Sequence, residues 1–136
     1  MVIDSSALVA ILLDEPERLQ FELALRGDPL RLVSAVTKHE ASVVMVGRFG
    51  PPGGQRLDRL LDLISAVIVP FDDAQCMIAR DAFIRYGKGR HRAGLNFGDC
   101  AAYALAIAEA EPLLLKGTDF GATDVTVVQP GAADDL

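Results

Sequence analysis

Short apolar runs alternate along the chain with longer segments in which apolar positions recur every three or four residues. The short runs predict buried strands, because they are rich in Val, Ile and Leu and are bounded by polar or turn-forming residues; they lie at 1–4, 31–33, 67–69, 112–115 and 125–128. The longer segments predict helices at 5–13, 17–26, 34–49, 55–65, 72–86 and 96–110. This alternation favours an α/β fold with a central parallel sheet that helices cover on both faces.

Two glycine-rich segments separate predicted helices. Gly50-Pro-Pro-Gly-Gly54 is expected to end the helix at 34–49, and residues 87–95 are expected to form a loop rich in glycine and arginine. The length of 136 residues suits one domain, which we place at 1–130, followed by a C-terminal tail at 131–136.

The apolar run Ala7–Leu13 does not resemble a signal peptide, because acids flank it and no basic segment precedes it. No run approaches the roughly 20 residues of a membrane span. We therefore expect a soluble, cytoplasmic protein without a membrane partner. The two cysteines, Cys76 and Cys100, form no metal-ligand spacing and are expected to be buried, reduced thiols.

Two acids lie where a parallel sheet binds its ligands, outside the carboxyl ends of its strands, and a third lies on a helix. Asp4 ends the first strand, Asp119 follows the strand at 112–115, and Asp99 lies in the first turn of a helix. Each position equally suits a helix cap, a turn or a first-turn acid that the helix dipole favours. Taken singly, these acids leave both interpretations open.

Glu40 lies in the middle of a predicted helix, and Val36, Val43 and Val44 share its face by helical spacing. A carboxylate on an apolar face is costly unless something pairs with it. If the fold brings Glu40 to the other three acids, four carboxylates repel one another and require cations. Hard divalent ions such as Mg²⁺ prefer oxygen ligands, and two such ions can clamp a phosphodiester during hydrolysis.

Four segments in this order resemble the motifs of the PIN-domain ribonucleases, and among these the VapC-type toxins. They are Val2–Leu8, His39–Glu40, Leu95–Cys100 and Leu114–Phe120, and the longer segment Tyr86–Cys100 is similar to one VapC subgroup. The resemblance implies a three-layer α/β/α fold. It also implies an endoribonuclease that serves as the toxin of a toxin–antitoxin pair.

The resemblance further implies which residues carry the site. Asp4, Glu40, Asp99 and Asp119 would surround Mg²⁺ or Mn²⁺, and Asp124 is an additional candidate ligand. Ser6 and Thr118 would support the site. Water activated by the metal would attack the phosphorus and leave a 5′-phosphate and a 3′-hydroxyl. RNA substrates such as tRNA, a cognate antitoxin and a homodimer are the implied partners.

The net charge of −6 at first argues against a nucleic-acid partner. The basic residues are concentrated, however, and the candidates for phosphate contacts are Arg85, Lys88, Arg90, His91, Arg92 and Lys116. For the loop residues, the alternative is a solvated loop without a partner.

Two other functions remain open at this point. An aspartyl-phosphate phosphatase requires a second Asp two residues after the first, where this chain has Ser6, and a phosphorylated receiver requires an Asp that residues 67–72 do not present convincingly. The second alternative is an interaction module of the same fold that cleaves nothing. Metal-dependent RNA cleavage that Asp4→Asn abolishes separates the nuclease from this module.

Overall fold

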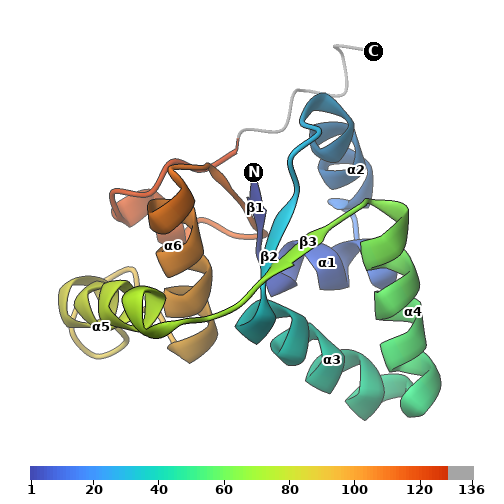
Figure 1. Ribbon diagram of the computed structural model, residues 1–136, viewed down its shortest axis with the longest axis horizontal. Coiled ribbons are helices and arrows are strands. Elements are labelled where there is room, and N and C mark those ends of the chain that lie inside the picture. The colour runs from blue at the N-terminus through green and yellow to red at the C-terminus, as the bar shows by residue number, and fades with distance from the viewer. Residues whose placement is uncertain (129–136) are drawn as a thin grey trace.

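The computed structural model describes residues 1–128, apart from the side chain of Asp119. Four parallel strands form one sheet at the centre (Figure 1), in the order β3-β2-β1-β4. The strands are β1 (Val2–Ile3), β2 (Leu32–Ser34), β3 (Val67–Val69) and β4 (Leu113–Leu114). The predicted parallel sheet is therefore confirmed, with strands that are shorter than expected at the two ends of the chain. The predicted tail and the boundary at residue 130 lie outside the described residues.

Helices cover both faces of this sheet, which confirms the three-layer α/β/α architecture. They are α1 (Ser5–Leu12), α2 (Arg18–Gly27), α3 (Ala35–Phe49), α4 (Pro51–Leu63), α5 (Asp73–Tyr86), α6 (Phe97–Glu109) and the short 3-10 helix η1 (Asp119–Ala122). In Figure 1, α5 and α6 lie to the left of the sheet, and α1 to α4 lie to the right and below.

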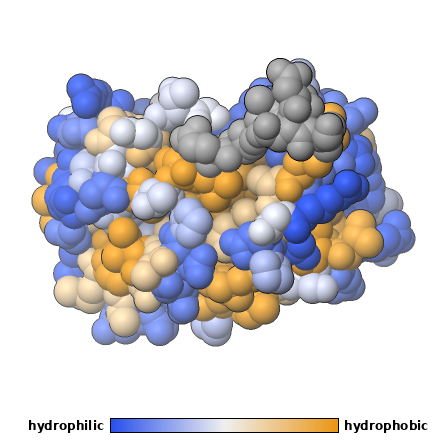
Figure 2. All heavy atoms as spheres, turned by 90° about the horizontal axis from the view of Figure 1, so that it is seen from above, coloured by the Kyte–Doolittle hydropathy of each residue, from blue (hydrophilic) through white to orange (hydrophobic). Residues whose placement is uncertain are grey.

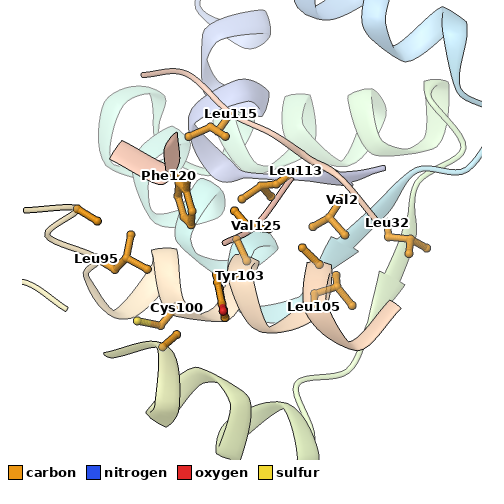
Figure 3. Close-up of a cluster of buried hydrophobic side chains, with 14 residues drawn as sticks. Val2, Leu32, Leu95, Cys100, Tyr103, Leu105, Leu113, Leu115, Phe120 and Val125 are labelled. Carbon is orange, nitrogen blue, oxygen red and sulfur yellow. The ribbon is translucent and has the colours of Figure 1, made fainter. Parts of the chain in front are cut away.

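Two apolar cores form because successive residues of a strand point to opposite faces. Val2 of β1 packs into the core under α5 and α6, whereas its neighbour Ile3 packs into the core under α1 to α4. Leu113 and Leu114 of β4 divide in the same way. Figure 3 shows the first core, in which side chains of α6 point toward β1 and β4. Burial on both faces explains why the strands read as continuous apolar runs.

Two predicted element boundaries are wrong. The helix expected at 55–65 begins at Pro51, because Gly50 turns the chain with a positive φ of 69° and prolines follow at the first two helical positions. Gly53 allows close packing, since a Cβ there would lie 2.6 Å from the carbonyl carbon of Met45. The last strand, expected at 125–128, is reduced to an isolated bridge between Val127 and Leu113.

The surface bears on two further expectations. Cys100 is buried, as predicted, but Cys76 is exposed on α5, so the prediction of two buried thiols is half wrong. Within residues 1–128, no helix has the length and apolar character that crossing a membrane requires. Figure 2, which views the end at the top of Figure 1, shows hydrophobic patches between hydrophilic ones.

Candidate active site

The strand order places a topological switch point beside β1. The chain places β2 on one side of β1 and later places β4 on its other side, so the connections leave β1 and β4 in opposite directions. In open α/β sheets, ligands bind at such a switch point, outside the carboxyl ends of the strands. Asp4 follows β1 directly, and the segment from Leu115 to η1 follows β4.

Asp4 is the N-cap of α1, and it is buried with 4% exposure. Its Oδ2 accepts hydrogen bonds from the backbone N–H of Ser6 at 3.1 Å and from the Ser6 hydroxyl at 2.6 Å. Its Oδ1 is buried and has no hydrogen-bond partner among the described residues. The capping role considered from the sequence is therefore real, but it occupies only one of the two oxygens.

The environment of Asp4 disfavours its charge. Burial is the largest cause and raises the pKa of Asp4 to about 6, while the hydrogen bonds from Ser6 oppose this rise. The negative charges of Asp99 and Glu40 raise the pKa further, which places these carboxylates within electrostatic reach of Asp4. A buried, unpartnered oxygen beside two more acids fits a cation ligand.

The predicted supporting role of Ser6 agrees with a second contact. The Ser6 hydroxyl accepts a hydrogen bond from the backbone N–H of Lys116 at 3.0 Å. This bond ties the segment after β4 to the start of α1. Ser6 therefore contacts both the Asp4 carboxylate and the segment that follows β4.

Glu40 reaches the site for a reason other than the predicted one. The buried face of α3 consists of Thr37, Ala41 and Met45, whereas Val43 and Val44 are exposed. The expectation that Glu40 lies on a buried apolar face is thus wrong, because the hydrophobicity of its neighbours did not reveal which side of α3 meets the core.

Glu40 is instead fixed by contacts from two other helices. Its Oε1 accepts a short hydrogen bond from the hydroxyl of Ser5 in α1. The carboxylate also lies against the backbone of Gly98 in α6, where a Cβ would collide with it. Sequence reasoning assigned no role to Ser5 or Gly98, since neither contact is encoded in a local pattern.

Asp99 belongs to a capping box at the start of α6. Its backbone N–H donates to Oδ1 of Asn96 at 2.9 Å, and the Asn96 backbone N–H donates to Oδ2 of Asp99 at 3.0 Å. The spacing Asn-x-x-Asp was a local signal for this arrangement. The box fixes the orientation of the Asp99 side chain at the start of α6.

Asp119, Thr118 and Asp124 are the remaining candidate site residues. Asp119 begins η1 after β4, but its side chain lies outside the described part of the structure. Thr118 precedes it and is exposed, and its backbone carbonyl accepts from the N–H of Gly121. The Asp124 carboxylate is engaged elsewhere, since it accepts from the Tyr103 hydroxyl at 2.6 Å and from Arg85 at 3.3 Å.

Among the side chains that the structure describes, no group of three or more His, Cys, Asp or Glu residues is arranged closely enough to hold a metal ion. Asp4, Glu40 and Asp99 thus interact through their charges without forming a closed ligand cluster. The predicted convergence of four carboxylates remains a prediction.

The basic residues fall into two groups. Arg85 pairs with Asp81 and Asp124 and lies over the ring of Tyr86 at 4.7 Å. His91 accepts from the N–H of Ala93 through Nδ1 and packs edge-on against the ring of Tyr86. Arg85 therefore ties α5 to the segment after η1, and His91 helps to hold the loop at 87–95.

The other basic candidates are exposed: Lys88, Arg90, Arg92 and Lys116. Arg90 lies over the ring of Phe83, with 5.7 Å between its guanidinium carbon and the ring centre. The ammonium group of Lys116 pairs with Glu15 and Glu17. Contacts of these four residues with RNA remain predictions.

Comparisons with known proteins agree with this architecture. The family model of the PIN domain matches residues 1–125. The chain is 52% identical to a protein named ribonuclease VapC from Mycolicibacterium smegmatis, over 94% of this chain and 99% of that protein.

Two solved structures share the fold at low sequence identity. The first is Mycobacterium tuberculosis VapC20, described as a sarcin–ricin loop cleaving toxin; its TM-score is 0.77 at 14% identity, with 95% of this chain and 98% of that chain covered. The second is VapBC2 from Rickettsia felis, bound to a DNA fragment from its promoter; its TM-score is 0.75 at 13% identity, with 96% and 98% covered. The matched family model and the close relative together show that this chain belongs to the PIN-domain family, among the VapC ribonucleases.

Proposed function

We propose that this chain is a divalent-metal-dependent endoribonuclease, the toxin of a toxin–antitoxin pair, and that Asp4, Glu40 and Asp99 hold its Mg²⁺ or Mn²⁺. The observation that carries the proposal is the buried, unpartnered Oδ1 of Asp4, which lies within electrostatic reach of the other two acids. Asp119 is proposed as a further ligand because it follows β4 at the same end of the sheet. We leave Asp124 out, since Tyr103 and Arg85 engage its carboxylate.

The proposed metal needs few protein ligands. Mg²⁺ keeps several of its waters, through which further acids can hold it, so the three acids need not form a closed cage of protein oxygens. When bound, such an ion supplies a water of lowered pKa and neutralises charge on the phosphate. The ion also offsets the repulsion between the three acids, which otherwise favours protonation of Asp4.

The chain's own side chains position these acids. Ser6 holds one oxygen of Asp4, Ser5 holds one oxygen of Glu40, and Asn96 orients Asp99. In each case, the hydrogen bond fixes one carboxylate oxygen in place, which prepares the group before any ligand arrives. Lys88, Arg90 and Arg92 would neutralise phosphates of the RNA strand.

The partner proposals rest on the relatives. RNA, including tRNA, is the proposed substrate, and the cytoplasm is the proposed compartment because such RNA is found there. A cognate antitoxin is proposed because a solved structure of similar fold is a toxin–antitoxin complex from Klebsiella pneumoniae. A cleft of acids would attract an arginine of that partner, since a guanidinium pairs with two carboxylate oxygens at once. A homodimer is proposed from the family resemblance.

Metal-dependent stability tests the site directly. Mn²⁺ at 100 times its Kd should stabilise the wild-type protein by about 2.7 kcal/mol relative to EDTA. Asp99→Asn should reduce this gain, whereas Asp62→Asn, which alters an exposed acid of α4, should keep it. Identical melting curves in EDTA and in Mn²⁺ for the wild type would refute the metal site.

Cleavage and toxicity test the activity. The wild-type protein should cleave RNA in Mn²⁺ and leave 5′-phosphates, and Asp4→Asn should abolish this cleavage. If the wild type binds metal but cleaves no RNA, the chain is an interaction module of the same fold. Expression of the chain alone should arrest growth, and co-expression of the neighbouring gene should relieve the arrest.

A further inference from the structure

An apolar cavity of about 290 Å³ lies between α5 and α6, outside the carboxylate site. Its lining consists of Phe71, Cys76, Ala79, Arg80, Phe83, Phe97 and Cys100. Three of these side chains are aromatic rings and one is a guanidinium group. The volume is at the lower limit of small-molecule sites, which measure roughly 300–1,000 Å³, so the cavity suits one flat ring system rather than a long chain.

The ring of Phe97 is presented to solvent. Phe97 is the first residue of α6 and is 79% exposed, whereas the next two residues of α6 that contact the interior, Gly98 and Cys100, are buried. Figure 3 shows Cys100 on the side of α6 that faces α5, which is the side of the cavity. Because Phe97 also lines the cavity, its exposed ring and the cavity form one apolar surface, the kind that marks interaction sites.

The cavity and the carboxylates share one helical turn. Phe97 lines the cavity, the backbone of Gly98 contacts the Glu40 carboxylate, and Asp99 carries a proposed metal ligand. Residues 97 and 99 are separated by about 200° around the helix axis. The aromatic face and the acids therefore flank the same turn on opposite sides, so a strand that passes over the start of α6 meets both.

Two guanidinium groups lie at the apolar cavity. Arg80 contributes to its wall, and Arg90 of the basic loop lies over the ring of Phe83, which is itself a lining residue. Apolar rings beneath a cationic rim match a strand whose bases are flat and apolar and whose backbone is anionic.

We propose that the cavity between α5 and α6 binds an unpaired nucleobase of the RNA substrate, which stacks on Phe97 while an adjacent phosphate lies at the carboxylates. This inference rests on the proposed ribonuclease function and extends it by naming a place where the substrate binds. Stacking is tolerant of base identity, because every base has a π-face. The cavity would then select single-stranded RNA over duplex, since a paired base cannot enter it.

The probe is a fluorescein-labelled RNA of twelve uridines with a single 2-aminopurine at its centre, titrated in EDTA so that it stays intact. The wild-type protein should quench the 2-aminopurine, because stacking on an aromatic ring quenches this base. Phe97→Leu keeps the apolar volume but removes the ring. It should abolish the quenching and weaken binding roughly 5- to 150-fold, the range that base–aromatic stacking contributes.

Two variants make the result specific. Phe97→Tyr should restore both the quenching and the affinity, because it restores the ring. Phe49→Leu removes another partly exposed ring, at the end of α3, and should change neither. Since Phe97 is mostly exposed, the variants should melt at the wild-type temperature and retain stabilisation by Mn²⁺.

Three outcomes would overturn the inference. Equal RNA affinity of Phe97→Leu and the wild type would show that no base stacks there. If Phe97→Leu reduces self-association in sedimentation velocity and leaves RNA affinity unchanged, the cavity is a contact between two copies of the chain. If Phe97→Tyr fails to restore the affinity, the ring is not the element that binds. Cleavage of RNA by the wild type in Mn²⁺ is measured separately, so failure of the stacking site and failure of the nuclease function are distinguishable.

Discussion

Gly98 lies in the first turn of α6, where its backbone faces the Glu40 carboxylate. A Cβ at this position would lie 2.6 Å from Cδ of Glu40, whereas ordinary contacts of a Cβ begin at 3.4 Å. Gly98→Ala therefore forces the carboxylate to retreat by roughly 1 Å, a displacement that can cost about 10²-fold in rate when a catalytic constellation is disturbed. We expect RNA cleavage by Gly98→Ala to fall about 100-fold.

The same substitution should change stability little. Alanine is a better helix former than glycine by about 1 kcal/mol, which stabilises α6. Loss of the hydrogen bond from Ser5 to Glu40 acts in the opposite direction, since a bond to a charged group contributes about 1.5–3 kcal/mol. Glu40 is only partly buried, so water replaces much of that bond when the carboxylate moves. The net change in the free energy of unfolding should lie within about 1 kcal/mol.

Gly47→Ala is the matched control, because Gly47 lies inside α3 and a Cβ there meets no atom within 4 Å. It should raise the melting temperature by about 3–5 °C and leave cleavage unchanged. The measurements are thermal unfolding by circular dichroism and initial rates of RNA cleavage in Mn²⁺. If Gly98→Ala cleaves at the wild-type rate, or if it unfolds many degrees below the wild type, the assigned role of this glycine is wrong.

Three further predictions follow from the packing and from the pKa shifts. The hydrogen bond from Tyr103 lowers the pKa of Asp124 from its ordinary 3.8, so it stabilises the fold above that pH and its contribution is lost as the pH falls through the folded pKa. Tyr103→Phe should raise the pKa of Asp124 in an NMR titration, and its cost in stability should be larger at pH 7 than at pH 3. Burial, with a smaller effect of the nearby acid, raises the pKa of the Cys100 thiol to about 11, so a thiol reagent at pH 8 should modify one cysteine per native chain, the exposed Cys76, and both after denaturation. Gly53→Ala should destabilise the protein by about 1–3 kcal/mol in thermal unfolding, because its Cβ would collide with backbone of α3 rather than with a movable side chain; an unchanged melting temperature would contradict this packing.

The hydrophobic pattern of the sequence was enough to predict the layers of the fold. Short apolar runs become parallel strands because both of their faces are buried, as Val2 and Ile3 show by packing into opposite cores. The sequence also predicted that Asp4 follows a strand and that Asp99 lies in a first helical turn, because caps and strand ends are local features.

Contacts between distant segments were decided only by the tertiary structure. The side of α3 that meets the core, and hence the surroundings of Glu40, depends on how α3 packs against α1 and α6. The ion pair between Arg85 and Asp124 joins residues 39 positions apart. It forms because the fold brings α5 next to the segment after η1. Such pairings are selected by the geometry of the packed elements, so no periodicity within either segment records them. The sequence by itself named the acids that are candidate metal ligands, and the packing decided which oxygen of Asp4 was left without a hydrogen-bond partner.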